Sequence, residues 1–302
     1  MRIYKNLNLI KDFKKSVLAI GNFDGVHLGH KRVIGEARKK AKDNNIKLGA
    51  MTFEPVPVMF FNKKIKSHRI NNLEQKIELL KKEKLDFLVI IKFNLKFSKI
   101  TAEQFIKKII IKKINAGFVF VSKNFKFGQK RQGNVSQLKN FEKKLFFKTC
   151  VTSPLNNKRK IISSTRIRNL IVKGKIKEAN ILLGREWSVK GKVVSGDKRG
   201  RKIGFPTCNI ELKEYIIPKL GVYSVKVKIG KVFKKGIANI GYRPTFNGKI
   251  LLLEVNIFRL KANLYNKTLT VSFIKFIRAE KKFNSINQLK LQIKKDIRKV
   301  NK

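Results

Sequence analysis

Two of the three histidines in the chain lie three positions apart in one short stretch, GNFDGVHLGH, at residues 21–30. Where such a turn becomes a helix, His27 and His30 can lie on one side and face the same phosphate group. The stretch also holds three glycines, which let the backbone approach a bulky anion closely: Gly21, Gly25 and Gly29. The pattern indicates a phosphate-binding turn in which both imidazoles act as donors.

Two other interpretations of this turn remain open. Both histidines could serve only the fold, as polar side chains in a glycine-rich turn. A zinc site is the second, but the sequence supplies no neighbouring cysteine or paired carboxylate to complete the four ligands that zinc usually takes. The concentration of so scarce a residue type at one place favours the phosphate-binding interpretation.

The first half of the chain alternates strand and helix patterns. The apolar run SVLAIGNF at 16–23 predicts a strand, and KRVIGEARKKAKDNN at 31–45 predicts a helix. The alternation continues with strands at 46–53, 85–93 and 117–122 and helices at 71–84 and 101–114. Thr101 and Gln104 form a capping-box pattern at the start of the last helix. This rhythm predicts a parallel sheet covered on both faces, with the ligand site at the carboxyl ends of its strands.

The rhythm changes near residue 184. Short strands separated by glycine or asparagine turns follow, which is typical of an antiparallel barrel or sandwich, and a helix at 285–300 closes the chain. We therefore expect two domains, 1–183 and 184–302. Because the second domain has its own pattern, we also expect the fragment 184–302 to fold by itself.

Composition limits the classes of protein that fit. The 302 residues include 72 Lys and Arg against 19 Asp and Glu, a formal charge of +53, and are 42% hydrophobic, which excludes a disordered chain. The positive charge is mostly lysine spread along the whole chain, so a compositional bias explains it better than a nucleic-acid surface. Cys150 and Cys208 lack metal-ligand spacing and are expected to be small buried side chains in a reducing compartment. With no signal-peptide core and no apolar run of about 18 residues, we expect a soluble cytoplasmic protein without a membrane partner.

Four motifs in the first half resemble those of the bacterial bifunctional riboflavin kinase/FAD synthetase family, whose first module is a nucleotidylyltransferase. They are GNFDGVHLGH, TFEPVP at 52–57, NFKFGQKRQGN at 124–134 and SSTRIR at 163–168. The resemblance implies a Rossmann-like α/β fold and adenylylation of FMN by ATP to give FAD and pyrophosphate. It implies catalytic roles for His27 and His30, and nucleotide or flavin binding by Gly21, Phe23, Asp24, Gly25, Gly29, Asn124, Ser164, Thr165 and Arg168.

This reaction suits the residues present. Adenylyl transfer is an in-line attack on the α-phosphorus of ATP, so catalysis consists of positioning and neutralising negative charge, without a nucleophilic side chain. Histidine donors, helix-terminal amides, Arg168 and the hydroxyls of Ser164 and Thr165 supply that neutralisation. A serine or threonine in SSTRIR would also cap the helix that follows, and both roles can hold together.

The second half resembles the flavokinase module of the same family through GKVVSGDKRGRKIGFPTCNI at 191–210, in which Cys208 stands where alanine is usual. The resemblance implies that Thr207 and Asn209 bind Mg²⁺, that Glu254 is the base for the riboflavin hydroxyl, and that Gly204 and Arg278 bind nucleotide or flavin. Glu254 lies in the apolar strand ILLLEVNIF, where an unpartnered carboxylate is hard to explain as core. No GxxxxGK[ST] motif is present, which excludes a Walker-type kinase.

Alternation within ILLLEVNIF predicts that Leu252, Glu254 and Asn256 share one face and that Leu253, Val255 and Ile257 share the other. The chain departs from the family pattern at five further positions, which concern substrate affinity more than chemistry: Val56 and Asn256 for histidine, Ser122 and Asn266 for glycine, and Arg259 for aspartate.

The interpretation that accounts for most of the sequence is a bifunctional enzyme with an α/β Rossmann-like domain and an all-β barrel closed by a helix. It would use ATP, riboflavin and FMN with Mg²⁺, and would have small-molecule partners without a specific nucleic acid. A relative that keeps one activity, and a basic nucleic-acid-binding protein, are the alternatives; the second predicts tight binding with a steep salt dependence.

Overall fold

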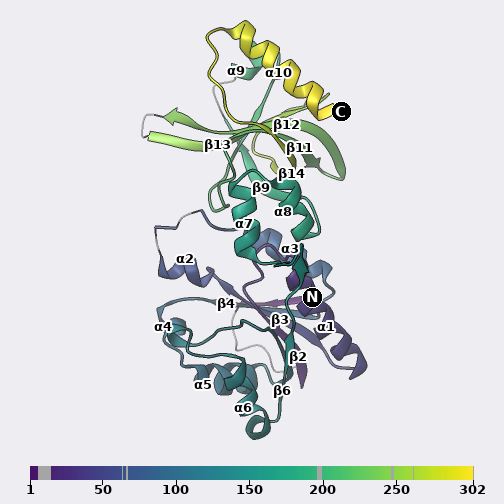
Figure 1. Cartoon of the computed structure of the whole chain (residues 1–302), viewed down its shortest axis with the longest axis vertical. Coiled ribbons are helices and arrows are strands. Elements are labelled where there is room, and N and C mark those ends of the chain that lie inside the picture. The colour runs from purple at the N-terminus through teal and green to yellow at the C-terminus, as the bar shows by residue number, and fades with distance from the viewer. Residues whose placement is uncertain are drawn as a thin grey trace. The chain divides into compact units, whose positions relative to one another are not determined.

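The computed structural model describes residues 1–5, 15–62, 64–65, 67–195, 199–245, 248–260 and 262–301. These residues form two compact units (Figure 1). Unit 1 comprises residues 1–66 and 73–163, and unit 2 comprises residues 67–72 and 164–302. The packing therefore divides the chain at a different place from the predicted boundary at 183/184, because two helices before that boundary and one short earlier segment pack with the barrel. The division of activities at 183/184 stays a prediction.

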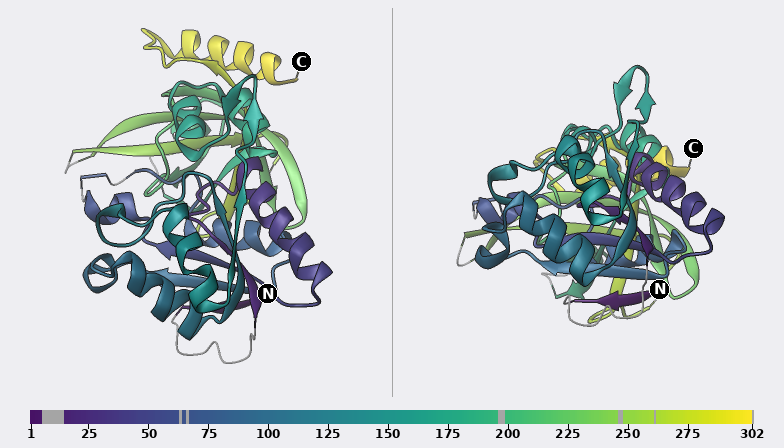
Figure 2. Two further views of the ribbon diagram at one scale, coloured as in Figure 1. Left: turned by 60° about the horizontal axis from the view of Figure 1, so that its bottom comes forward. Right: turned by 90° about the horizontal axis from the view of Figure 1, so that it is seen from below.

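Unit 1 contains the predicted parallel sheet. Its six strands follow the order β1-β4-β3-β2-β5-β6 and every neighbouring pair is parallel. The strands are β1 (Arg2–Tyr4), β2 (Ser16–Ile20), β3 (Leu48–Glu54), β4 (Phe87–Lys92), β5 (Ala116–Ser122) and β6 (Lys148–Thr152). A separate two-stranded hairpin consists of β7 (Asn156–Asn157) and β8 (Lys160–Ile161) (Figure 2).

Helices cover both faces of this sheet, as predicted. On one face α1 (Leu28–Asp43) and α3 (Leu73–Lys82) complete a core in which Val33, Ile34, Ala37 and Ala41 are buried. On the other face lie α5 (Ala102–Gln104), η1 (Phe105–Lys113) and α6 (Val135–Leu145). The short helices of unit 1 are α2 (Pro57–Phe61), α4 (Leu95–Ser98) and η2 (Gln129–Arg131).

The predicted helix at 101–114 is only partly an α-helix. The capping box is present, with the Gln104 amide donating to Thr101 Oγ1 at 3.1 Å and the Thr101 amide donating to Gln104 Oε1 at 3.3 Å. After three residues the helix continues as a π-helix. Phe105, Ile106, Ile109 and Ile110 are the buried residues of this π-helix.

Unit 2 contains a closed barrel with the order β10-β13-β12-β11-β14-β9, in which the neighbouring strands are antiparallel. The strands are β9 (Trp187–Val194), β10 (Cys208–Glu211), β11 (Gly221–Ile229), β12 (Val232–Thr245), β13 (Gly248–Ile257) and β14 (Thr268–Arg278). The helices are α7 (Ser164–Val172), α8 (Ile176–Leu183), α9 (Arg199–Lys202) and α10 (Ile286–Asn301), and α10 packs near β12 (Figure 1). No helix among the described residues is long and apolar enough to cross a membrane.

The sequence of the closing helix α10 places Ile286, Leu289, Ile293 and Ile297 on one face. Ile297 does pack against buried core residues, together with the buried Val300, whereas Ile286 is 61% exposed. The first turn of the helix therefore lies away from the core.

The barrel core is tied to residues outside the predicted second domain. Trp187, which stacks on Phe273 at 4.6 Å between ring centroids, donates from Nε1 to the Ile70 carbonyl at 2.9 Å. Asn180 of α8 accepts from the Trp187 amide at 2.7 Å and donates to the Phe273 carbonyl at 2.9 Å. The segment 67–72 and α8 thus satisfy polar groups around the largest buried side chain of unit 2.

We therefore expect the fragment 184–302 to be less stable than the sequence pattern suggests. It lacks Ile70 and Asn180, which accept hydrogen bonds from Trp187. A buried N–H group without its acceptor lowers the free energy of unfolding by about 1–3 kcal/mol. A fragment 164–302, which keeps α7 and α8, should unfold at a higher urea concentration than 184–302. Equal unfolding midpoints for the two fragments would contradict this structural role of α7 and α8.

Candidate functional site

The glycine-rich turn connects β2 to α1, where parallel-sheet proteins bind ligands. The backbone takes positive φ values at Phe23 (47°), Gly25 (83°) and Val26 (36°) before α1 begins at Leu28. Phe23 and Asp24 are buried, with 1% and 5% of their surface exposed. A Cβ atom on Gly29 would lie 3.2 Å from the His27 ring, so a glycine fits this position best. The turn therefore aims the first amides of α1 at the carboxyl edge of the sheet.

The two imidazoles of the turn are stacked on one another. Their ring centroids are 3.6 Å apart and the ring planes differ by 18°. His27 is the N-cap of α1, and its Nδ1 accepts from the His30 amide at 3.3 Å. Because Nδ1 is the acceptor, a neutral His27 carries its proton on Nε2, which leaves that nitrogen as a donor. The predicted placement of both rings on one side is present, and their catalytic role stays a prediction.

The predicted motifs of unit 1 follow neighbouring strands. Residues 21–30, 52–57 and Asn124 lie at or beyond the carboxyl ends of β2, β3 and β5, which are adjacent in the sheet. Thr52 Oγ1 donates to the Asn22 carbonyl at 3.0 Å and so ties β3 to the glycine-rich turn. Asn124 is exposed in the turn that follows β5. The parallel topology thus brings these three segments to one edge, as predicted.

One charged pair at this edge was not anticipated. Lys76 of α3 is 1% exposed, and its Nζ lies 3.9 Å from Glu54 Oε2 at the end of β3. In the sequence Lys76 is one lysine among many on a polar helix, so nothing there distinguishes it from a solvated residue. Only the packing of α3 identifies it as buried.

Residues 164–168 of the SSTRIR motif begin α7 and belong to unit 2. Ser164, Thr165 and Arg168 lie in its first two turns, and Arg168 Nη2 donates to Thr165 Oγ1 at 3.5 Å. The motif lies at a helix N-terminus, where backbone amides point along the helix axis in a direction that suits an anion, and Ile167 is buried and anchors the helix.

A second polar cluster lies on the face of β10, β13 and β12. The strand register places Glu254 of β13 opposite Asn209 of β10 and opposite Asn239 of β12. Leu253, Val255 and Ile257 are buried at 0%, 1% and 9% exposure, so the predicted alternation of β13 is confirmed. Asn256 shares the face of Glu254 and donates from Nδ2 to the Pro206 carbonyl at 2.7 Å.

Two side-chain oxygens at the start of β10 and just before it suit a hard cation. Asn209 Oδ1 is buried and accepts no hydrogen bond from any residue that the structure describes. Thr207, two residues earlier, is exposed and offers a hydroxyl. Amide and hydroxyl oxygens are ligands of the kind that Mg²⁺ takes, together with water and phosphate oxygens. These two side chains therefore fit the metal implied for this module.

Glu254 is held by an arginine that the sequence analysis missed. Arg243 of β12 donates from Nε to Glu254 Oε1 at 2.9 Å and from Nη2 to Oε2 at 2.8 Å. The hydrogen bonds to the Glu254 carboxylate raise the pKa of Arg243. Eleven residues separate the two side chains, and only the register of β12 with β13 brings them together.

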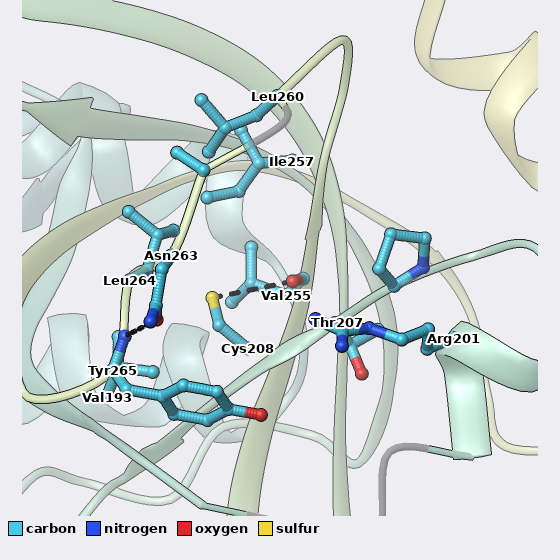
Figure 3. Close-up of a pocket in the computed structure, with 12 residues that line it drawn as sticks. Val193, Arg201, Thr207, Cys208, Val255, Ile257, Leu260, Asn263, Leu264 and Tyr265 are labelled. Atoms are coloured by element: carbon cyan, nitrogen blue, oxygen red, sulfur yellow. Dashed lines mark hydrogen bonds between the residues drawn. The ribbon is translucent and has the colours of Figure 1, made fainter.

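A pocket opens beside Thr207 in unit 2 (Figure 3). Its lining includes Arg201, Cys208, Leu264 and Tyr265. Cys208 directs its Sγ to the Val255 carbonyl at 3.5 Å, and burial raises the pKa of this thiol to about 11. Both cysteines are free and partly buried, less enclosed than predicted.

Several predicted residues have clear local reasons for their identity. Gly204 has a φ of 87° and Asn266 a φ of 63°, a left-handed conformation in which glycine is easiest and asparagine is tolerated. Asn266 can therefore replace the usual glycine without a change of turn.

Val56 and Ser122, two other departures from the family pattern, have different surroundings. Val56 is 4% exposed and precedes α2 as its N-cap, and Ser122 ends β5 with an exposed side chain. Residues 196–198 of the predicted kinase motif lie outside the described residues.

Arg278 is engaged within the fold. It donates from Nε to Asp296 Oδ2 at 2.9 Å, with Nη2 at 2.8 Å from the same oxygen, and Asp296 is 1% exposed. Gln292 donates to the other oxygen of Asp296 at 2.8 Å. This pair fastens α10 to the end of β14. The ligand-binding role of Arg278 stays a prediction.

We expect Arg278→Met to lower the free energy of unfolding of unit 2 by about 3 kcal/mol, because it leaves Asp296 buried without its cation. Lys275→Met is the matched control, since Lys275 also joins β14 to α10, through an exposed hydrogen bond to the Lys299 carbonyl. That control should change stability by about 0.5 kcal/mol or less. Urea unfolding of both variants tests this, and equal effects would contradict it.

Comparison with known proteins identifies the family to which both parts of the chain are similar. A family model described as FAD synthetase matches residues 9–166, and one described as riboflavin kinase matches residues 183–302. A bifunctional riboflavin kinase/FMN adenylyltransferase of Buchnera aphidicola is 44% identical, with 98% of this chain and 96% of the relative covered. One of the same name from Bacillus subtilis is 39% identical, with 96% and 93% covered.

Among solved structures, a protein of Streptococcus pneumoniae described as a macrolide-efflux protein superimposes with a TM-score of 0.88. It is 32% identical, and the match covers 99% of this chain and 98% of that one. The two proteins therefore share both modules and their order, while the efflux description applies to the other protein.

Proposed function

The chain belongs to the family of bifunctional riboflavin kinases/FMN adenylyltransferases, and we propose that its two activities divide between residues 184–302 and 1–183. It is a transferase that phosphorylates riboflavin to FMN with ATP and joins FMN to the AMP part of ATP to give FAD and pyrophosphate. The observation that supports the division is the presence of one polar candidate site in each unit, at residues 21–30 and around Glu254.

In the adenylylation, the turn at 21–30 is the proposed phosphate site. The attack of the FMN phosphate on the α-phosphorus of ATP builds negative charge on oxygens that need fixed donors. His27 offers Nε2–H from a ring that is 4% exposed and fixed by its Nδ1 hydrogen bond, and His30 stacks on it. We assign Gly21, Gly25 and Gly29 to close approach of the backbone, and Ser164, Thr165 and Arg168 to phosphate binding.

The flavin ring of FMN has a suitable platform in unit 1. Phe60, Phe61 and Phe93 pack edge to face with centroids 5.3–5.7 Å apart, and Phe61 is 67% exposed. An exposed ring beside the carboxyl edge of the sheet gains from covering by another flat ring system. We assign the flavin to this aromatic group and to the neighbouring turn with Asn124.

In the kinase reaction, Glu254 is the proposed base. Its carboxylate accepts the proton of the riboflavin hydroxyl as that oxygen attacks the terminal phosphorus of ATP, and ADP leaves. Thr207 and Asn209 would hold Mg²⁺, which supplies neutralising charge to the ATP phosphates when bound. The support for this assignment is the register of Asn209 with Glu254 and the unpartnered Asn209 Oδ1 among described residues.

The remaining assignments concern setting and partners. We propose a cytoplasmic enzyme whose partners are the small molecules ATP, riboflavin and FMN. The charge of +53 is spread along the chain, and we assign it to general basic composition and not to a specific nucleic-acid site.

Incubating the full chain with riboflavin, ATP and Mg²⁺ and separating the flavins by chromatography tests the proposal. FMN should appear first and FAD afterwards, and supplied FMN should give FAD directly. FAD from FMN without FMN from riboflavin would instead identify a relative that keeps only the adenylylation.

A further inference from the structure

The guanidinium of Arg243 lies between two carboxylates that come from different parts of unit 2. On one side it makes the two hydrogen bonds to Glu254 of β13. On the other side its Nη1 is 3.9 Å from Oε1 of Glu280, which follows the end of β14. Nη1 also donates to the Tyr242 carbonyl at 3.3 Å. Each nitrogen of the guanidinium therefore has a partner, and the group is fixed in one plane.

The Glu280 side chain packs against β12 and is held there by a hydrogen bond. Asn239 Nδ2 donates to Glu280 Oε1 at 3.1 Å. Gly241, two residues further along the strand, leaves the space for this carboxylate, because a Cβ atom at 241 would overlap Glu280 Oε1. Asn239, Gly241 and Arg243 are alternate residues of one strand and share a face. Asn239 and Gly241 thus accommodate the Glu280 carboxylate beside Arg243 on the same face of β12.

We propose that Arg243 and Glu280 are positioning residues for the kinase reaction: Arg243 fixes the plane of the Glu254 carboxylate, and Glu280 fixes Arg243. This inference rests on the proposed function, in which Glu254 takes the proton of the riboflavin hydroxyl. The two hydrogen bonds from Arg243 use one lone pair on each carboxylate oxygen and leave another on each for the substrate. The base is thereby oriented while it remains able to accept a proton.

Exposure separates this role from a purely structural one. The side chains of Arg243, Glu254 and Glu280 are 39%, 26% and 38% exposed. Ion pairs at such exposure contribute little to folding stability. Neutralising Glu280 should therefore lower the turnover number of the kinase and leave the unfolding temperature nearly unchanged, whereas a structural pair would do the reverse.

The experiment uses full-length protein with riboflavin as substrate and compares Glu280→Gln, Arg243→Lys, Arg243→Met and Glu280→Gln combined with Arg243→Met. Steady-state kcat and KM, thermal unfolding, and FAD formation from supplied FMN are measured for each. Glu211→Gln is the matched control, because Glu211 is another partly exposed barrel glutamate, paired with Lys213 at 3.0 Å.

We expect kcat for FMN formation to fall about 30-fold in Arg243→Met and about 5-fold in Glu280→Gln, with KM for riboflavin within about twofold, the signature of lost transition-state stabilisation. Arg243→Lys should resemble Arg243→Met, because an ammonium group cannot make both hydrogen bonds. In the Arg243→Met background, Glu280→Gln should have no further effect, since Glu280 acts through Arg243. FAD formation from FMN and the Glu211→Gln variant should match the unaltered protein.

Unchanged kcat in Arg243→Met would overturn the role of Arg243. Effects of Arg243→Met and Glu280→Gln that multiply in the double variant would show that Glu280 acts independently of Arg243. That result would overturn the proposal that Glu280 acts by fixing Arg243. A loss of thermal stability that accompanies each loss of kcat would assign both residues to folding. Absence of FMN formation by the unaltered chain would instead refute the proposed kinase function itself.

Discussion

Replacing His27 by asparagine is expected to lower the rate of FAD formation from FMN and ATP by about 100-fold or more. This is the usual effect of losing one preorganised donor at a developing negative charge. The ring that donates from Nε2 is removed. FMN formation from riboflavin continues, because Glu254 and its neighbours belong to unit 2 whereas His27 belongs to unit 1. Initial rates of both reactions, measured on one preparation, test the prediction.

The choice of asparagine separates catalysis from folding. His27 caps α1 through Nδ1, and asparagine is a good N-cap residue, so the helix keeps an acceptor for the His30 amide. His27→Ala loses both roles and should also destabilise unit 1 by about 1 kcal/mol. His30→Ala should lower FAD formation comparably. His68→Ala replaces the third histidine, which lies in the segment 67–72, and serves as the control with normal FAD formation. Equal loss of both activities in a folded His27→Asn protein would argue against two separate sites.

Features that depend on residues close together in the chain could be predicted from the sequence. The histidine spacing, the glycines and the apolar pattern of α1 all lie within one short segment, and the structure buries the apolar residues at helical spacing, Val33, Ile34, Ala37 and Ala41. The alternation of strands and helices likewise predicts the covered parallel sheet, because helix and strand periods differ clearly. Parallel topology then brings the motifs at 21–30 and 52–57 to one edge.

The sequence was insufficient where distant residues meet. Arg243 contacts Glu254 only through the register of β12 and β13, and register is not readable from alternation alone. Glu280, which follows β14, meets Arg243 of β12 although these strands are not neighbours in the barrel, and its position depends on the space left at Gly241. The segment 67–72 packs with the barrel although its sequence precedes an α3 helix of the other unit. Lys76 is buried for the same kind of reason, since a tertiary contact and not its local pattern determines its surroundings.

Replacing Glu254 by glutamine is the change expected to act most strongly on the kinase. Glutamine keeps the length and one oxygen that can accept from Arg243, but its amide cannot take a proton from the riboflavin hydroxyl. Loss of a general base typically costs about 10²–10⁴-fold, so FMN formation should fall by that factor. Because the change keeps the size of a side chain that is 26% exposed, thermal unfolding should change little.

Asn256→His is the matched comparison on the same face of β13. Asn256 donates to the Pro206 carbonyl, which places it near the Thr207 segment, and Glu254 is the proposed proton acceptor on this face. Histidine can also donate there, and it titrates near neutral pH where asparagine does not. The substitution should therefore alter the pH dependence of FMN formation and change its rate much less than Glu254→Gln. If Glu254→Gln forms FMN at the unaltered rate, Glu254 is not the base. A rate loss in Asn256→His as large as that in Glu254→Gln would show that the reaction depends on Asn256 and its contact with Pro206 as much as on Glu254.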